Sequence, residues 1–203
     1  VLETHTHADH VSGHGRFALE HGVPTSVHPL AEPEFPFEPL EDGQELSAGS
    51  VSVRVIHTPG HRPEHCAFVV DDRLVLTGDS LFIGDAARPD LAVEAREGAE
   101  GLFHSLQRLT QLPDTYEVYP GHVAGSLCGA AMSPDHSSTI GNEKRTNAKL
   151  EYGDVQAFIN ATASLSTPRP PTTAHVVALN KGPFVGAPAQ LEHLDDPDPA
   201  AAG

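Results

Sequence analysis

The sequence predicts an α/β fold, and three observations lead to this prediction. Val51, Val53 and Val55 alternate with mostly polar neighbours, which is the two-residue period of a strand. The stretch 98–112 carries leucines and a phenylalanine at helical spacing, so we expect an amphipathic helix that packs on the sheet. Several predicted strands end in histidine or aspartate, which places reactive side chains together at strand ends.

The first element is a strand end that delivers a histidine-rich loop. Residues 1–4 read as the last part of a strand, and His5-Thr6-His7-Ala8-Asp9-His10 follows. In an extended run, residues two apart face the same way, so His5 and His7 can converge on one ion. Asp9 and His10 then point elsewhere and could serve a second ion. Because imidazole and carboxylate are ligands that borderline divalent metals prefer, we predict a metal site.

The next elements lead to a second histidine at a strand end. Residues 12–20 predict a helix with Ser12 as N-cap and Gly22 near its end, followed by a short strand at 23–28 and a surface loop at 29–42. The strand from residue 51 runs into the loop 57–65. Its Pro59-Gly60 turn places His61 at the strand end, whereas His57 and His65 read as supporting histidines.

A hairpin supplies the third candidate ligand. Residues 66–70 and 74–77 read as its strands, turned at Asp71-Asp72. Asp79 follows the second strand after Gly78, which permits a tight backbone approach, and is a candidate ligand or metal bridge. Arg88 in the next loop could bind a substrate carboxylate or pair with a neighbouring acid.

The last predicted strand, 117–119, is followed by Pro120-Gly121-His122. This is the same pattern as at His61, in which a strand leads through a Pro-Gly turn to a histidine. In the glycine-rich loop that follows, Cys128 either faces the site or is a loop cysteine without a role. Residues 139–159 predict one helix. From residue 167 onward prolines punctuate the chain, and we expect an extended tail or linker that is disordered at its end.

Composition limits the class of protein. The net charge of −16, from 28 acidic and 12 basic residues, disfavours nucleic acid and anionic membranes as partners. Two cysteines do not form a disulfide framework, and no apolar run approaches the length of a membrane span. We therefore expect a cytoplasmic protein that binds neither nucleic acid nor membrane.

The ordered set of motifs resembles the metallo-β-lactamase superfamily. The order is H-x-H-x-D-H at 5–10, T-P-G-H at 58–61, T-G-D at 77–79 and P-G-H at 120–122. An ordered set is far more specific than any single motif. The resemblance implies an αββα sandwich with a metal at one edge of its two sheets.

A narrower resemblance, to bacterial persulfide dioxygenases, covers nearly the whole chain to about residue 185. It depends on the runs at 77–85, 88–91, 125–129, 137–141 and 145–147. It implies an enzyme that oxidises the sulfane sulfur of a thiol persulfide, such as glutathione persulfide, with O₂ to sulfite. It also implies one Fe(II) per chain, held by His5, His61 and Asp79. Two histidines and one carboxylate also match the facial triad of non-haem iron oxygenases.

The same resemblance implies roles for the other candidates. Supporting groups that orient the ligands, or a second metal site, would be His7, Asp9, His10 and His122. Arg88 is the first candidate for binding the thiol's polar body, with Cys128 and Arg145 as further substrate-binding candidates. A rhodanese sulfurtransferase is a possible partner, because such domains often follow the proline-rich segment in similar proteins.

The expected organisation is a metallo-β-lactamase-like domain at 1–165 and a proline-rich tail or linker at 166–203. The domain is expected to lack its first strands, because similar proteins begin with several strands before the histidine loop. Losing them should expose a sheet edge, which would encourage a homodimer.

Two rival interpretations stay open. The first is a dinuclear zinc thiolester hydrolase resembling glyoxalase II, with two Zn(II) sharing Asp79; the remaining ligands would be His5, His7 and His61 for one zinc and Asp9, His10 and His122 for the other. The second is a non-enzymatic fragment or sulfur-binding module that serves a partner.

Overall fold

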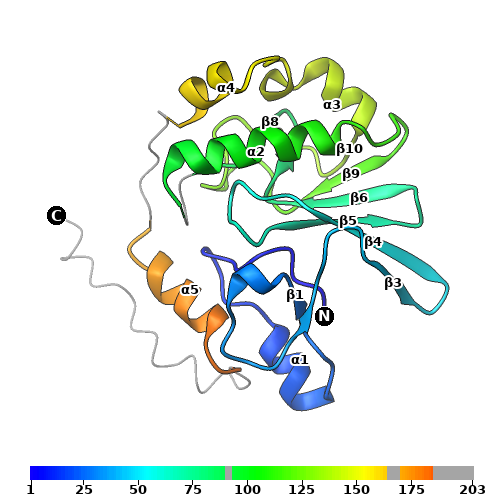
Figure 1. The fold of residues 1–203 in the computed structure, drawn as a ribbon, viewed down its shortest axis with the longest axis vertical. Coiled ribbons are helices and arrows are strands. Elements are labelled where there is room, and N and C mark those ends of the chain that lie inside the picture. The colour runs from blue at the N-terminus through cyan, green and yellow to red at the C-terminus, as the bar shows by residue number, and fades with distance from the viewer. Residues whose placement is uncertain (90–92, 164–169, 185–203) are drawn as a thin grey trace.

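The structure is a computed structural model that describes residues 1–89, 93–163 and 170–184 (Figure 1). Its centre is a six-stranded sheet in the order β10-β9-β6-β5-β4-β3. The strands of this sheet are β3 (Glu45–Ala48), β4 (Val51–His57), β5 (Cys66–Val70), β6 (Leu74–Gly78), β9 (Glu117–Pro120) and β10 (Ser138–Thr139). The α/β class predicted from the sequence is confirmed.

Smaller elements complete the described fold. Two pairs of short strands lie outside the central sheet: β1 (Ser26–Val27) with β2 (Glu38–Pro39), and β7 (Leu81–Phe82) with β8 (Asp85–Ala86). The helices are α1 (His14–His21), η1 (Pro29–Ala31), α2 (Ala95–Leu109), α3 (Ile140–Thr146), η2 (Ala148–Leu150), α4 (Val155–Thr162) and α5 (Thr173–Lys181). An isolated bridge also joins Leu2 to Ser26 of β1.

The main core lies between the sheet and the helices α2, α3 and α4, which cover the same face of the sheet (Figure 1). Alternation decides which side chains enter it, because successive residues of a strand point to opposite faces. In β5, Ala67 and Val69 face these helices, and Cys66 and Phe68 join a second cluster on the other face. Cys66 is fully buried, and burial raises the pKa of its thiol to about 12, as expected for an inert cysteine.

The directions of three strands place the candidate ligands at one edge. β4 and β6 are each antiparallel to β5, and β6 is parallel to β9. The carboxyl ends of β4, β6 and β9 therefore reach the same edge of the sheet. His61, Asp79 and His122 lie in the chain just beyond those three ends. The hairpin turn at Asp71 and Asp72 is also confirmed, and both residues have positive φ, of 50° and 47°.

Three local predictions are wrong. Ser12 does not cap α1, because its hydroxyl hydrogen-bonds Glu3 instead. The single helix at 139–159 is three helices, because Asn147 caps η2 and Asp154 caps α4 with their side chains. The segment from residue 167 is not extended throughout, since it contains α5. The predicted domain boundary at 165/166 and the predicted disordered end lie outside the described residues.

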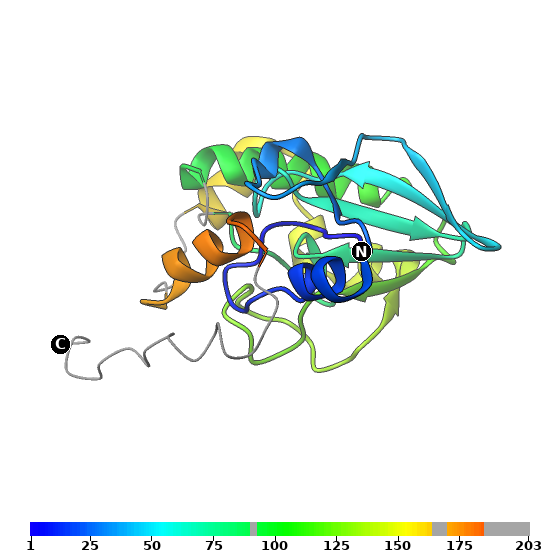
Figure 2. The ribbon, with the colours of Figure 1, turned by 90° about the horizontal axis from the view of Figure 1, so that it is seen from below.

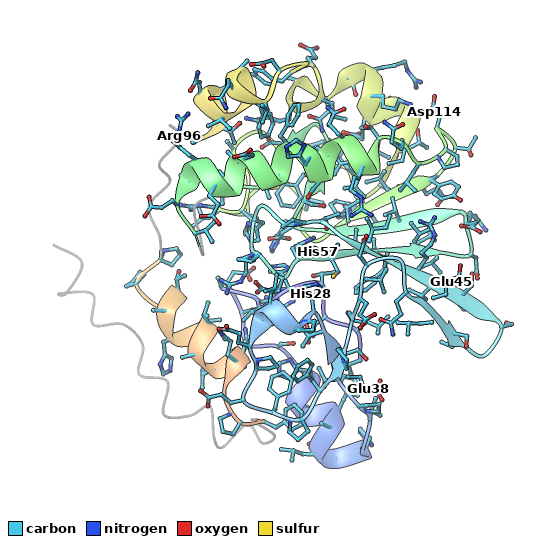
Figure 3. The ribbon with its side chains drawn as sticks, in the orientation of Figure 1. His28, Glu38, Glu45, His57, Arg96 and Asp114 are labelled. Carbon is cyan, nitrogen blue, oxygen red and sulfur yellow. The ribbon has the colours of Figure 1, made fainter. Side chains whose placement is uncertain are left out.

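His57 has a structural position, in agreement with its interpretation as a supporting residue. Its ring stacks on that of His28, with centroids 4.1 Å apart and planes 5° from parallel (Figure 3). Its Nε2 also lies 2.7 Å from the carbonyl oxygen of Pro63. His57 thereby joins the end of β4 to the loop before η1.

Candidate metal centre

The buried part of the site consists of His5, His61 and Asp79, whose side chains are 1–2% exposed. The Oδ2 atom of Asp79 lies 3.4 Å from Nε2 of His61 and 3.9 Å from Nε2 of His5. This carboxylate oxygen is buried and accepts no hydrogen bond within the described residues. An orphaned carboxylate oxygen facing two imidazole nitrogens is what a bound cation would explain.

The second ring nitrogen of each histidine is already occupied. Nδ1 of His61 donates to the carbonyl oxygen of Arg88 at 3.0 Å. Nδ1 of His5 lies 2.9 Å from Oγ1 of Thr4. Because the other nitrogen of a metal-binding histidine is normally fixed in this way, both rings present Nε2 to the common point.

The turn that carries His61 is held in place by α2. Gly60 lies so close to this helix that a Cβ there would be 2.5 Å from the backbone of Leu102, and its φ is +148°. Oγ of Ser105 donates to the carbonyl oxygen of Pro59 at 2.6 Å. The proline-glycine turn predicted from the sequence therefore fits against a helix as well as ending a strand.

His65 anchors Asp79 through the backbone. Nε2 of His65 accepts the Asp79 N–H at 2.9 Å, and Nδ1 lies 2.8 Å from Oγ1 of Thr58. Burial lowers the pKa of His65 to about 3, so the ring is neutral and can accept this bond. Gly78 permits the approach, because its φ is +50° and a Cβ there would lie 2.7 Å from Nε2 of His65.

The electrostatics suit a cation. Burial lowers the pKa of His5 and of His61, which keeps both imidazoles neutral and able to donate a lone pair. Burial alone would raise the pKa of Asp79, but His122, His61 and His5 together hold it far below its usual range. Two neutral imidazoles and an ionised carboxylate are the protonation states that a divalent metal requires.

A second, more exposed group adjoins the first. Nε2 of His122 lies 3.3 Å from Oδ2 of Asp79 and 3.3 Å from Oδ2 of Asp9. The Asp79 carboxylate, with a smaller contribution from Cys128, raises the pKa of His122 to about 10. His122 thus lies between two carboxylates, at a position suited to positive charge.

The remaining residues of the histidine loop lie beside this second group. Ligand atoms of His7, Asp9 and His10 lie within 4.8 Å of one another. Nδ1 of His7 is buried without a hydrogen-bond partner among the described residues, and its Nε2 lies 3.4 Å from Oε2 of Glu3. The described residues therefore also contain enough ligands for a second cation.

A cavity of about 380 Å³ opens beside the metal centre. Two of the three predicted substrate-binding residues, Arg88 and Cys128, line it together with Asp9 and His122. Its remaining wall consists of Ala8, Ser126, Leu127, Pro170, Thr172 and Thr173. The structure does not bring Arg145 to this cavity, because Arg145 lies exposed on α3. Asp90, an alternative partner for Arg88, lies outside the described residues.

The sequence interpretation missed Glu64, a residue that supports the ligands. Its Oε1 accepts the backbone N–H of Thr6, which lies between His5 and His7, at 3.1 Å, and the Nε–H of Arg62 at 2.6 Å. Glu64 and Arg62 are 1% and 8% exposed, so this ion pair is buried. Its only sequence signal is an acid within the loop that carries His61.

The substitution Gly121→Ala should weaken metal binding without unfolding the protein. An added Cβ would lie 2.5 Å from Oδ1 of Asp79, so the carboxylate would have to move. Gly153→Ala is a matched control, because a Cβ there meets nothing within 4 Å. Metal affinity is measured by competition with a chelator. Equal affinities of the two variants would contradict the position assigned to Asp79.

The metal-free protein should lose stability in mild acid. The pKa of His65 is about 3 in the folded state and 6.5 in the reference state, so unfolding takes up a proton between these values. Below pH 6.5 the free energy of unfolding should therefore fall by up to about 1.4 kcal/mol per pH unit for this histidine. Burial also lowers the pKa of His5 and of His61, so both histidines add to the loss of stability in acid. His122 affects stability in a different pH range, because its pKa is raised. Its stabilising contribution is complete below pH 6.5 and is lost as the pH rises through about 10.

Urea unfolding of chelator-treated protein at pH 7.5 and 5.5 measures this loss. A His65→Asn variant should show a shallower dependence, because it removes one of the titrating groups. Stability that stays constant or increases on acidification would show that the buried histidines are not held neutral.

Comparison with known proteins places this geometry in a family. The Metallo-beta-lactamase superfamily matches residues 1–122. Among curated relatives, the mitochondrial persulfide dioxygenase ETHE1 of Bos taurus is 28% identical over 184 residues, covering 89% of this chain and 67% of the relative. Within the described residues, no helix has the length and apolar character needed to span a membrane.

Two solved structures resemble the fold. A metallo-beta-lactamase from Staphylococcus aureus has a TM-score of 0.83 and 29% identity, and the match covers 92% of this chain. This chain spans only 58% of that protein's length. The crystal structure of ETHE1 from Myxococcus xanthus has a TM-score of 0.78 and 28% identity, with 89% of this chain and 75% of that chain covered.

Proposed function

The chain belongs to the metallo-beta-lactamase superfamily, and on this premise we propose that it is a persulfide dioxygenase with one Fe(II) held by His5, His61 and Asp79. The observation that carries the proposal is this buried set of two imidazoles and one carboxylate. Such a triad leaves open positions at iron for a substrate and for O₂. The similarity to proteins named persulfide dioxygenase gives independent support.

The proposed reaction joins a thiol persulfide, O₂ and water to give the thiol and sulfite. The S–S bond is cleaved, and the terminal sulfur loses four electrons to O₂ and takes its three oxygen atoms from O₂ and water. The remaining sulfur leaves as the thiol, and two protons are released. Iron, when bound, supplies the site at which the persulfide sulfur and O₂ meet. For this chain's own residues the task is to bind the persulfide and exclude other reactions.

The cavity beside the triad is the proposed substrate site. Arg88 is 7% exposed and lines it, so its guanidinium can bind a carboxylate of the thiol's body. His122 is the residue that can hold or move a proton, because it lines the same cavity and contacts Asp79. The backbone of Arg88 also supports the metal centre, since its carbonyl oxygen accepts from His61.

A second candidate function is thiolester hydrolysis at two zinc ions. The observation that favours it is the second group of ligands around Asp9 and His122, which lies directly against Asp79. Both candidates use the same protein scaffold. They differ in metal, stoichiometry and co-substrate.

Metal analysis of protein produced under iron-replete conditions separates the two candidates. We expect one iron per chain and no hydrolysis of a glutathione thiolester. Two zinc ions per chain, together with thiolester hydrolysis, would replace the dioxygenase by the hydrolase.

A further inference from the structure

Helix α5 lies beside the histidine loop, although the two segments are far apart in the sequence (Figures 1 and 2). Its carboxyl end is fixed by several contacts. The N–H of Glu34 donates to the carbonyl oxygen of Lys181 at 2.6 Å, and the rings of Phe184 and Phe35 stack at 4.6 Å. These contacts hold α5 against the segment after η1.

Asn180 is the residue of α5 that contacts the loop directly. Its Nδ2 donates to the carbonyl oxygens of His7 at 2.9 Å and His10 at 2.8 Å. Its Oδ1 accepts the backbone N–H of Ser12 at 2.8 Å. The side chain is buried, with the residue 5% exposed, and both of its N–H groups are used.

The turn 7–12 depends on these bonds. Among the described residues, its backbone groups take part in no backbone–backbone hydrogen bond. Asn180 therefore supplies three bonds that a helix or sheet would otherwise provide. The same turn carries Asp9 and His10 and directly follows His5 and Thr6.

We propose that Asn180 is a positioning residue of the metal centre, because it holds the turn 7–12 in the conformation that aims Asp9 at His122. The inference rests on the proposed metal site and assigns α5, expected from the sequence to be tail, to that site. Glu3 also contacts the turn, through His7 and the hydroxyl of Ser12.

The test compares Asn180→Asp with Asn160→Asp. Asn180→Asp places a carboxylate against two carbonyl oxygens and removes both N–H donors. Asn160→Asp is the control, because it makes the same chemical change at an exposed position on α4. We expect the Fe(II) and Co(II) affinities of Asn180→Asp to fall about 10- to 100-fold, as for other groups that orient ligands. The visible spectrum of the Co(II) protein at saturation should also change. Asn160→Asp should match the parent in both.

Hydrogen exchange in the parent protein tests directly whether Asn180 holds the turn 7–12. In the parent protein the Ser12 amide should exchange as slowly as the amides of α5, because both open only when α5 leaves. In Asn180→Ala it should exchange faster. An unprotected Ser12 amide in the parent, or an Asn180→Asp protein with the parent's metal affinity and Co(II) spectrum, would overturn the proposal. Absence of O₂ consumption would instead contradict the proposed function alone.

Discussion

Asp79→Asn should abolish iron retention. The amide is nearly isosteric with the carboxylate, but it carries no charge. Because His5 and His61 are neutral ligands, Asp79 supplies the negative charge of the triad. Protein loaded with Fe(II) and passed over a desalting column should carry no iron in the variant and one iron per chain in the parent. Activity should disappear with the metal.

Asp72→Asn controls for the chemical change itself. Asp72 lies at the far hairpin turn with its side chain 76% exposed, and asparagine tolerates its positive φ. This variant should retain iron. The Asp79→Asn variant should also lower the pKa of His122, since the Asp79 carboxylate is the main cause of its raised value. Full iron retention by Asp79→Asn would show that the triad is wrongly assigned.

Glu64→Ala should destabilise the protein by about 3–5 kcal/mol, the usual cost of removing one partner of a buried ion pair. Arg62 would be left buried at 8% exposure without the carboxylate that lies 2.6 Å from its Nε. The backbone N–H of Thr6, between His5 and His7, would also lose its acceptor. Urea unfolding measures the loss.

The double variant Arg62→Met with Glu64→Leu separates stability from positioning. Replacing both charges by apolar side chains should recover most of the stability. The Thr6 N–H would still have no acceptor, so metal affinity should stay below that of the parent. If the double variant regained both the stability and the metal affinity of the parent, Glu64 would have no role beyond neutralising Arg62.

The strand-end pattern predicted that several candidate ligands would lie together, and the sheet explains why three of them do. His61, Asp79 and His122 each follow a strand, and the alternating directions of β4, β5 and β6 bring those ends together. The alternation of Val51–Val55 predicted β4, and the helical spacing at 98–112 predicted α2, which the structure places three residues earlier, at Ala95–Leu109. These patterns involve residues that are near one another in the chain, so they can be read from the sequence alone.

The contribution of α5 was missed for a physical reason. Prolines at 168, 170, 171 and 183 dominate this stretch, and they favour an extended chain. Between them, Thr172 and Gly182 stand just outside the two ends of a short helix, which is the available signal. Its contact with the histidine loop spans about 170 residues of chain and depends on tertiary packing. The bond from the Asp79 N–H to His65 also depends on the pairing of β5 with β6.

Oxygen uptake with glutathione persulfide tests the central claim most directly. Protein carrying one Fe(II) per chain should consume one O₂ for each sulfite formed and return glutathione, and chelator-treated protein should consume none. Folded, iron-loaded protein that consumes no O₂ with this substrate would contradict the assignment of the triad to persulfide oxidation.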